Sequence, residues 1–264
     1  MIERIKDINA DTRVLCLLGD PVSHSLSPRL HNSLICHYGL NLVYVACRVT
    51  DIKSALSGLK AFNFMGANVT IPFKEAVIPY VDGIDEPART AGAINVIAEK
   101  EGTLHGYNTD VYGIRKALPV RDKSIAILGA GGAARAACVA LACNDLTVVA
   151  RNEEKTLRFA REFQCRATTD IEIIKECDII VNATPVGMIP HVGESPVPRE
   201  LLRETDTVFD MVYTPLHTQL LVDASSVGAR CISGMEMFIH QAVKSFEIWT
   251  GILPDAEHAR EVLS

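Results

Sequence analysis

Short apolar runs alternate with helix-length segments along most of the chain. In the first half, the runs at 14–18, 42–47 and 67–69 predict strands, because each is a short and nearly continuous apolar stretch. The segments 27–38 and 51–61 between them predict helices. This β-α-β-α order predicts a mostly parallel sheet with helices on both faces.

The same rhythm restarts near residue 120, after a segment at 118–123, LPVRDK, that is typical of a linker. Beyond it, apolar runs of strand length again alternate with stretches of helix length. The predicted elements are 124–128, 133–142, 146–150, 152–163, 179–181, 208–210 and 235–250, with a short helix from Asp255. The chain is therefore predicted to be an α/β protein, long enough for one large domain or two modest ones.

The composition narrows the class of protein. Of the 264 residues, 48% are hydrophobic and 22% are charged, as in ordinary globular domains, which excludes disorder over most of the length. The net charge is -6 and the chain has no basic run that would neutralise several phosphates, so nucleic acid is not an expected partner. The most apolar window, 124–143, contains Arg135 and three glycines, and it predicts a strand, a turn and a helix rather than a membrane span.

The chain has eight cysteines, which is a high count. Their spacing contains no CxxC pair and no zinc-ligand pattern, so no metal site is expected. Most lie in apolar runs, as Cys16, Cys47 and Cys138 do, which predicts buried, reduced thiols in a cytoplasmic protein. The charged stretch 1–11 lacks the apolar run of a signal peptide and favours the same compartment.

A glycine-rich turn follows the predicted strand 124–128. The sequence SIAILGAGGAA fits the pattern G-x-G-x-x-G/A, with Ala134 in the third position. Gly129 permits a tight turn, a Cβ at Gly131 would collide with a pyrophosphate, and the next helix offers free N–H groups and a partial positive charge. The expected dinucleotide-binding residues are Gly129, Ala130, Gly131, Gly132 and Ala133. The alternative is a plain glycine-rich turn.

The tip of the next strand distinguishes the two nicotinamide cofactors. An NAD site usually has an Asp or Glu there, about twenty residues after the glycines, to bind the ribose hydroxyls. Here the tip is Arg151, followed by Asn152, and a guanidinium matches a 2′-phosphate in charge and donor geometry. NADP is therefore the expected cofactor. Glu153 and Glu154 leave mixed use of NAD open, although they also suit the first turn of a helix.

Seven further motifs surround this turn in order along the chain. They are GDPVSHSLSPRLHN at 19–32, GANVTIPFK at 66–74, GAIN at 92–95, GYNTDVYG at 106–113, NATPVGM at 182–188, DMVYTPLHT at 210–218 and GMEMFIHQ at 234–241. The ordered set resembles the shikimate dehydrogenase family over nearly the whole chain. The resemblance implies a substrate-binding and catalytic domain at 1–110 plus 235–264, and a doubly wound Rossmann domain for NADP at 111–234.

The same resemblance implies a reversible, NADPH-dependent reduction of 3-dehydroshikimate to shikimate, a step of chorismate and aromatic amino acid biosynthesis. Reducing the ketone leaves an alkoxide that needs a proton, and the reverse oxidation needs a base. Lys74 matches the family's acid/base lysine, and Asp110 matches the carboxylate that would orient its ammonium. From the residues alone, a lone lysine such as Lys74 is usually a solvated surface charge, although the predicted helix start at this position disfavours a positive charge. Asp110 alone would be an ordinary N-cap.

Six residues match family positions that bind the substrate. Ser25 and Ser27 match a serine pair for the ring carboxylate, and hydroxyls at i and i+2 point the same way in an extended segment. Ser27 would otherwise cap a helix that continues with Pro28 and ends at Gly39. The other matches are Tyr213, near the same carboxylate, and Thr70, Asn95 and Gln241, near the ring hydroxyls.

A further group matches family positions near the nicotinamide. Thr184 would lie in the loop after a predicted strand, and Gly234 and Met237 would line the same pocket. His24 and His31 lie within the first motif. We interpret both histidines as structural residues rather than as a catalytic base.

Two departures from the family pattern leave alternatives open. Val96 stands where the family commonly has threonine, and Ala150-Arg151-Asn152 replaces the usual N-R-T. The nearest alternative is a quinate/shikimate dehydrogenase that uses NAD or both cofactors, since a small pocket change decides whether one more ring hydroxyl is accepted. A methylene-tetrahydrofolate dehydrogenase and a non-catalytic nucleotide sensor are disfavoured by the intact substrate and catalytic motifs. A homodimer is one expectation for the assembly, and a membrane is not an expected partner.

Overall fold

The computed structural model describes residues 8–263, and the chain divides into two compact units. The first unit comprises the chain up to Thr109 and again from Gln241 onward, and the second unit is Asp110–His240. Part of the charged segment 1–11, from which a compartment is inferred above, lies outside the described residues.

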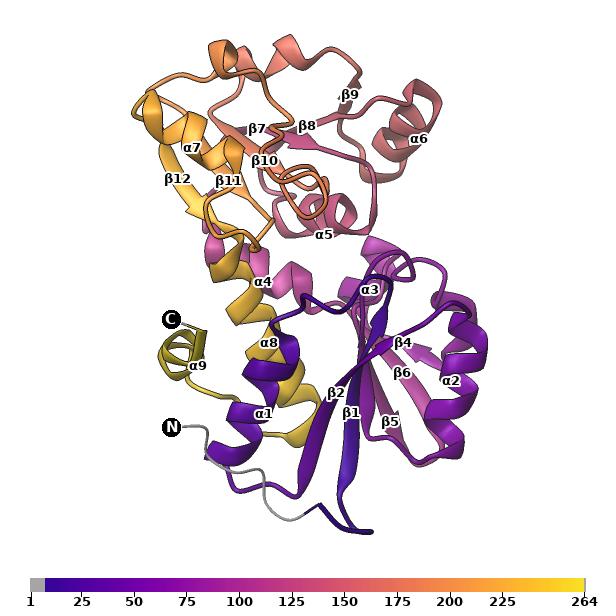
Figure 1. The fold of residues 1–264 in the computed structure, drawn as a ribbon. Helices are drawn as coiled ribbons and strands as arrows, with labels where there is room; N and C mark the ends of the chain where they lie inside the picture. The colour runs from indigo at the N-terminus through magenta and orange to yellow at the C-terminus, as the bar shows by residue number, and fades with distance from the viewer. Residues whose placement is uncertain (1–7, 264) are drawn as a thin grey trace. The chain divides into compact units, whose positions relative to one another are not determined.

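A six-stranded sheet forms the centre of the first unit. Its strands are β1 (Arg13–Gly19), β2 (Leu42–Arg48), β3 (Gly66–Val69), β4 (Gly83–Ile84), β5 (Val96–Lys100) and β6 (Thr103–Tyr107). Their spatial order is β2-β1-β3-β5-β6-β4 (Figure 1). β1 runs parallel to β2 and β3, and β4 runs parallel to β6, as a mostly parallel sheet requires. β5 is antiparallel to both neighbours, and a short turn joins it to β6 in a hairpin.

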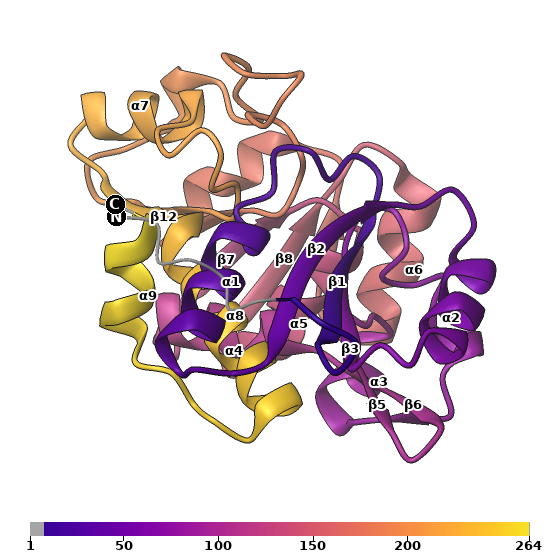
Figure 2. The ribbon, with the colours of Figure 1, turned by 60° about the horizontal axis from the view of Figure 1, so that its bottom comes forward.

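Helices cover both faces of this sheet (Figures 1 and 2). They are α1 (Ser27–His37), α2 (Ile52–Ala61), α3 (Glu86–Ala91), the end of α8 (Gly234–Thr250) and α9 (Ala256–Leu263). Ile52, Leu56 and Leu59 of α2 recur at helical spacing and pack in one core with β1 and β3. On the other face, Trp249 Nε1 of α8 donates to Ile97 O at 2.9 Å. The C-terminal helices therefore complete the core of the first unit.

The second unit contains a six-stranded, wholly parallel sheet. Its strands are β7 (Ser124–Leu128), β8 (Asp145–Val149), β9 (Arg166–Thr168), β10 (Ile179–Asn182), β11 (Thr207–Asp210) and β12 (Arg230–Ser233). The order β12-β11-β10-β7-β8-β9 is the Rossmann order, with its switch point between β7 and β10. The predicted doubly wound fold is confirmed.

Two apolar cores lie on opposite faces of this second sheet. The helices are α4 (Thr109–Ala117), α5 (Gly132–Ala140), α6 (Glu153–Phe163) and α7 (Gln219–Ser226), with short 3₁₀ helices at Ile171–Glu176 and Arg199–Leu201. α5 and α6 pack with Ile125 and Ile127, whereas α7 and the 3₁₀ helices pack with Ala126 and Leu128. Alternate residues of β7 thus face opposite helical layers, as a strand's period of two requires.

The burial of the cysteine side chains agrees only in part with the prediction. All eight cysteines are free, and Cys16, Cys138 and Cys177 are buried. Cys143 and Cys231 are exposed, so the prediction of burial is wrong for them. Within residues 8–263, no helix is long and apolar enough to cross a membrane, and no group of three or more His, Cys, Asp or Glu residues is placed to hold a metal ion.

Candidate active site

Lys74 lies in the segment that follows β3. Its side chain is partly buried, and its carbonyl oxygen accepts a hydrogen bond from Ile94 N at 2.8 Å. The predicted helix start at this position is wrong, because turns occupy residues 74–77 and only a 3₁₀ helix, Ile78–Tyr80, follows. Backbone pairing with the GAIN motif, rather than a helix N-terminus, therefore holds Lys74 in place.

Asn95 is the next residue of that motif, and its amide is bonded to Thr109. Asn95 Oδ1 accepts from Thr109 N at 2.7 Å, and Asn95 Nδ2 donates to Thr109 Oγ1 at 3.0 Å. Thr109 Oγ1 also lies 3.5 Å from Gln241 Oε1 of α8. All three residues are buried, so Gln241 is not the surface residue that an amphipathic helix would allow. The first unit thus brings Lys74, Asn95 and Gln241 into one hydrogen-bonded region.

Asp110 directly follows Thr109 and is only 4% exposed. It lies in the first turn of α4 rather than before it, so the N-cap interpretation is wrong. The helix starts two residues earlier than an N-cap at Asp110 would place it, because Asn95 already accepts the N–H of Thr109.

The serine pair lies at the start of α1. Ser25 Oγ accepts a hydrogen bond from Ser27 N at 3.2 Å, and Ser27 is buried. The N-cap residue is Leu26 and it has no side-chain cap, so the predicted capping role of Ser27 is wrong. Thr70 packs against the end of β1, where a Cβ on Gly19 would lie 2.2 Å from Thr70 Cγ2. The absence of a side chain at Gly19 therefore leaves room for Thr70 beside the end of β1.

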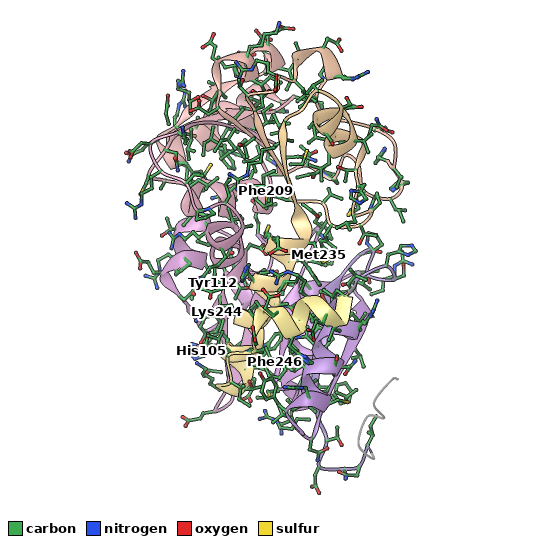
Figure 3. All side chains as sticks on the ribbon, turned by 90° about the vertical axis from the view of Figure 1, so that its left-hand side faces the viewer. His105, Tyr112, Phe209, Met235, Lys244 and Phe246 are labelled. Atoms are coloured by element: carbon green, nitrogen blue, oxygen red, sulfur yellow. The ribbon has the colours of Figure 1, made fainter. Side chains whose placement is uncertain are left out.

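His31 is completely buried among aromatic rings. It stacks on Tyr44 with ring centroids 4.5 Å apart and meets the edge of Trp249 at 5.4 Å, while Phe246 of α8, labelled in Figure 3, lies at 6.4 Å. Neither ring nitrogen has a hydrogen-bond partner within the described residues. Burial lowers the pKa of His31 to about 3, so the ring is neutral and packs as an apolar group. His24, by contrast, is exposed.

The glycine-rich turn lies at the switch point of the second unit. Gly129 has φ of 110°, and a Cβ there would lie 3.1 Å from Ala183 O and 3.2 Å from Thr184 Cγ2. The turn after β7 thus touches the loop after β10, where doubly wound sheets bind nucleotides. A Cβ on Gly131 would meet no atom within 4 Å, so open space remains above the N-terminus of α5. The residues present therefore fit a dinucleotide pyrophosphate.

Arg151 and Asn152 follow β8 directly, and both are exposed. Asn152 is the N-cap of α6 and accepts a hydrogen bond from Lys155 N at 2.8 Å. Glu153 and Glu154 lie in the first turn of that helix, as the alternative interpretation of these two carboxylates requires. Arg151 is thus the cation at this strand tip that suits a 2′-phosphate.

The remaining predicted residues lie near the ends of β10, β11 and β12. Tyr213 stacks on Phe238 of α8 with centroids 4.4 Å apart. A Cβ on Gly234 would lie 2.5 Å from Met211 O, so only glycine fits at the start of α8. Met237 is 7% exposed and packs in the core that contains α5.

Sequence patterns did not single out the residues that hold these loops. Asn182, Asp210 and Thr218 are buried and hydrogen-bonded to one another, and Thr109 links Asn95 to Gln241. All four stand inside motifs, but their side-chain contacts depend on neighbouring segments that periodicity does not pair. The sequence signal that could have identified Asn182 and Asp210 is a polar residue at the end of an apolar strand.

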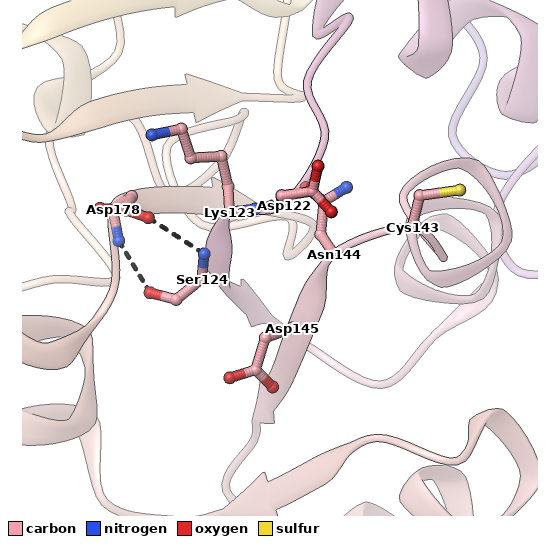
Figure 4. A pocket seen from close by; sticks show the side chains of 7 residues that line it. All are labelled: Asp122, Lys123, Ser124, Cys143, Asn144, Asp145 and Asp178. Atoms are coloured by element: carbon pink, nitrogen blue, oxygen red, sulfur yellow. Dashed lines mark hydrogen bonds between the residues drawn. The ribbon is translucent and has the colours of Figure 1, made fainter.

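A separate hollow lies at the opposite edge of the second sheet. It is lined by Asp122, Lys123, Ser124, Cys143, Asn144, Asp145 and Asp178 (Figure 4). Ser124 N donates to Asp178 Oδ2 and Asp178 N donates to Ser124 Oγ, each at 3.1 Å. Since ligands of doubly wound sheets bind at the carboxyl ends of strands, this hollow at the amino ends of β7 and β8 is not the nucleotide site.

Family models match three parts of the chain. The shikimate dehydrogenase substrate-binding domain matches residues 17–97, and the shikimate 5′-dehydrogenase C-terminal domain matches residues 234–263. A model described as NADP oxidoreductase, coenzyme F420-dependent, matches residues 124–210, within the Rossmann unit.

Known proteins match over nearly the full length. The shikimate dehydrogenase (NADP(+)) of Pyrococcus abyssi is 42% identical over 257 residues, which cover 95% of this chain and 97% of the relative. That of Methanocaldococcus jannaschii is 42% identical and covers 95% of each chain. Among solved structures, a shikimate dehydrogenase in complex with NADP+ has a TM-score of 0.92 at 40% identity and covers 97% of this chain and 96% of its own.

A second solved structure, from Thermus thermophilus, holds both NADP(H) and shikimate. It has a TM-score of 0.89 at 35% identity and covers 95% of this chain and 98% of its own. A mixed α/β unit and a Rossmann unit with a glycine-rich switch point define the class of two-domain, nucleotide-binding α/β proteins. Within that class, the chain belongs to the shikimate dehydrogenase family.

Proposed function

We propose that this protein catalyses the reversible, NADPH-dependent reduction of 3-dehydroshikimate to shikimate. The relatives at 42% identity are shikimate dehydrogenases that use NADP(+), and they match over 95% of this chain. The observation that carries the proposal is the hydrogen-bonded region in which Lys74 pairs with Ile94, and the adjacent Asn95 pairs with Thr109. These bonds fix the backbone of Lys74 against the segment of Asn95, whose buried amide suits a polyhydroxylated ring.

Lys74 is the proposed acid and base. When NADPH is bound it supplies the hydride, and the carbonyl carbon of the substrate accepts it. The Lys74 ammonium gives a proton to the developing alkoxide, and the neutral amine removes the hydroxyl proton in the reverse direction. Asp110, set in the first turn of α4 beside the anchored Thr109, is proposed to orient that ammonium.

Six residues are proposed to recognise the substrate. Ser25 and Ser27, already linked through the backbone of Ser27, would donate to the ring carboxylate together with Tyr213. Thr70, Asn95 and Gln241 would bond the ring hydroxyls. Thr109 supports this role because it orients the amides of both Asn95 and Gln241.

NADP is the proposed cofactor. Its pyrophosphate would lie over the turn of Gly129, Ala130, Gly131, Gly132 and Ala133, and its 2′-phosphate beside Arg151 and Asn152. Thr184, Gly234 and Met237 are proposed to lie near the nicotinamide. The quinate and NAD alternative is not favoured, because the quinate dehydrogenase of Corynebacterium glutamicum, solved with NAD, is 29% identical with a TM-score of 0.86.

Steady-state absorbance of the reduced nicotinamide tests this proposal. Purified protein is mixed with shikimate or quinate, each with NADP or NAD. Shikimate with NADP is expected to give the highest kcat/KM of the four combinations. An absence of turnover with shikimate and either cofactor would contradict the proposal. Faster turnover of quinate than of shikimate would indicate that quinate is the substrate.

Three further expectations belong to the proposal. Residues 1–110 plus 235–264 are proposed to be the substrate domain, and residues 111–234 the NADP domain. The eight free cysteines support a cytoplasmic location. A homodimer is supported by the edge strand β2, where Val45 is an exposed apolar residue, and light scattering of the purified protein tests it.

A further inference from the structure

Asn182 and Asp210 are neighbours at the carboxyl ends of two adjacent strands. They are the last residues of β10 and β11, and they face each other in the parallel register. Both are 0% exposed, and Asn182 Nδ2 donates to Asp210 Oδ1 at 2.9 Å. Within the described residues no lysine, arginine or histidine forms an ion pair with Asp210, and burial raises the pKa of its carboxyl group. The carboxylate thus depends on hydrogen bonds alone.

Asp210 also holds the segment that contains Tyr213. Its Oδ1 accepts from Val212 N at 3.0 Å, and its Oδ2 accepts from Thr218 Oγ1 at 2.6 Å. Thr218 in turn is the N-cap of α7, where its Oγ1 accepts from Leu221 N. One carboxylate therefore fixes the chain on both sides of Tyr213.

Asn182 holds the other loop. Its Oδ1 accepts from Thr184 N at 3.0 Å and from Thr184 Oγ1 at 2.7 Å, and its Nδ2 also donates to Val186 O at 3.2 Å. The backbone adds a further link, since Met211 N donates to Asn182 O at 3.0 Å. The loop with Thr184 and the loop with Tyr213 are consequently held by one buried side-chain pair.

We propose that Asp210, with Asn182, is a positioning residue that sets Thr184 and Tyr213 for cofactor and substrate. This inference rests on the proposed function, in which Thr184 serves the nicotinamide and Tyr213 the substrate carboxylate. A carboxylate accepts short, directional bonds from amide and hydroxyl donors, which suits it to hold two loops in a fixed geometry. Desolvating a carboxylate is unfavourable, so a position that only fills the core would be better served by an apolar side chain.

Asp210→Asn tests the proposal, because it keeps the shape and replaces one accepting oxygen with a donor. The dissociation constant of NADP, from a fluorescence or calorimetric titration, and the KM for shikimate are each expected to rise about tenfold, with the pH profile of kcat unchanged. A residue that only stabilises the fold would lower the active fraction, and hence the apparent kcat, and would leave both constants unchanged. That second pattern overturns the proposal.

Asp206→Asn is the matched control. Asp206 is a carboxylate with 1% exposure just before the same strand β11, and it accepts from Arg203 N and Nε at 2.7 and 2.8 Å. Loss of the Asp206 carboxylate is expected to lower the melting temperature without changing the KM for shikimate or the dissociation constant of NADP. If Asp206→Asn shifts these constants as much as Asp210→Asn, the positioning role is overturned.

A second pair of variants covers the case in which Asp210→Asn fails to fold. Thr218→Val removes the hydroxyl and keeps the shape, whereas Thr218→Ser keeps the hydroxyl. The KM for shikimate is expected to rise at least fivefold in Thr218→Val and to stay within twofold of wild type in Thr218→Ser. Equal values in the two variants would contradict the role. If the wild type binds NADP but turns over no shikimate, the proposed function fails. The NADP titration of Asp210→Asn then still tests whether Asp210 positions Thr184 through Asn182.

Discussion

At the scale of single residues, His31 shows how burial overrides a side chain's usual chemistry. A histidine in a motif invites a role as a base, but this ring is enclosed by Tyr44, Phe246 and Trp249 and has no hydrogen-bond partner in the described structure. The pKa falls from 6.5 to about 3, so the protonated form is excluded from the native state. The interpretation of His31 as a structural residue agrees with this environment.

His31 predicts how stability depends on pH. Because the folded pKa lies below the unfolded value, the contribution to stability is full above about pH 6.5 and is lost as pH falls toward about 3. When the pH falls from about 7.5 to about 4.5, the unfolding free energy of His31→Leu is expected to decrease by about 2–3 kcal/mol less than that of the wild type. Urea unfolding at the two pH values measures this.

His217→Gln is the control for this experiment, because His217 is exposed. It is expected to lose stability on acidification as the wild type does. If His31→Leu and the wild type lose equal stability over the same interval, the account of His31 is wrong.

Residue identities were easier to predict from the sequence than residue environments. The motifs named Lys74, Asp110 and Ser27 as candidates, but the predicted helix start, N-cap and cap at these positions were wrong. At Lys74 and Asp110 the local pattern does not contain the long-range hydrogen bond that decides the geometry, whereas at Ser27 the helix simply has its N-cap one residue earlier, at Leu26. The bond from Thr109 N to Asn95 Oδ1, which begins α4, joins residues 14 positions apart.

At the scale of elements, the turn between β7 and α5 is the most specific feature. Gly129 has a φ of 110°, and an added Cβ would lie close to the loop after β10, so a side chain there meets both backbone strain and a tight contact. Gly129→Ala is expected to lose ~1–2 kcal/mol of stability and to weaken NADP binding at least tenfold. Thermal unfolding and an NADP titration measure the two effects.

Gly58→Ala is the matched control for this substitution. Gly58 lies inside α2, where an added Cβ would meet no atom within 4 Å. The change is expected to stabilise the protein by about 0.5–1 kcal/mol, because alanine is the better helix former, and to leave NADP binding unchanged. Wild-type NADP affinity in Gly129→Ala would contradict the assigned role of the turn.

Periodicity predicted most strands and helices of both units, including the four-residue strands β3, β10 and β11, and missed several others. The strands at β1, β2, β7 and β8 and the helices α1, α2 and α6 lie within a residue or two of their predicted bounds. β4, β9 and β12 have two to four residues and none of these is buried, so no apolar run marks them, unlike the buried strands β3, β10 and β11. The hairpin of β5 and β6 was missed because its strands mix buried and exposed positions and include glycine and charged residues.

At the scale of the whole molecule, the first unit is built from two parts of the chain that are far apart in the sequence. Residues from Gln241 onward belong to the first unit, and Trp249 bonds to β5 across 152 positions of sequence. A hydrophobic pattern is local and gives no sign of such a return, whereas the resemblance to a known family implied it. The relatives, which match over 95% of the chain, support one activity for the complete pair of units.

In the proposed reaction, the Lys74 side chain passes the proton that hydride transfer requires. The most direct test is the turnover of Lys74→Ala with shikimate and NADP, measured beside its affinity for shikimate and beside Lys53→Ala, a control at an exposed lysine of α2. We predict a loss of roughly 10²–10⁴-fold in kcat for Lys74→Ala, with shikimate affinity within about threefold of wild type and full activity in the control. Undiminished turnover in Lys74→Ala would contradict the account.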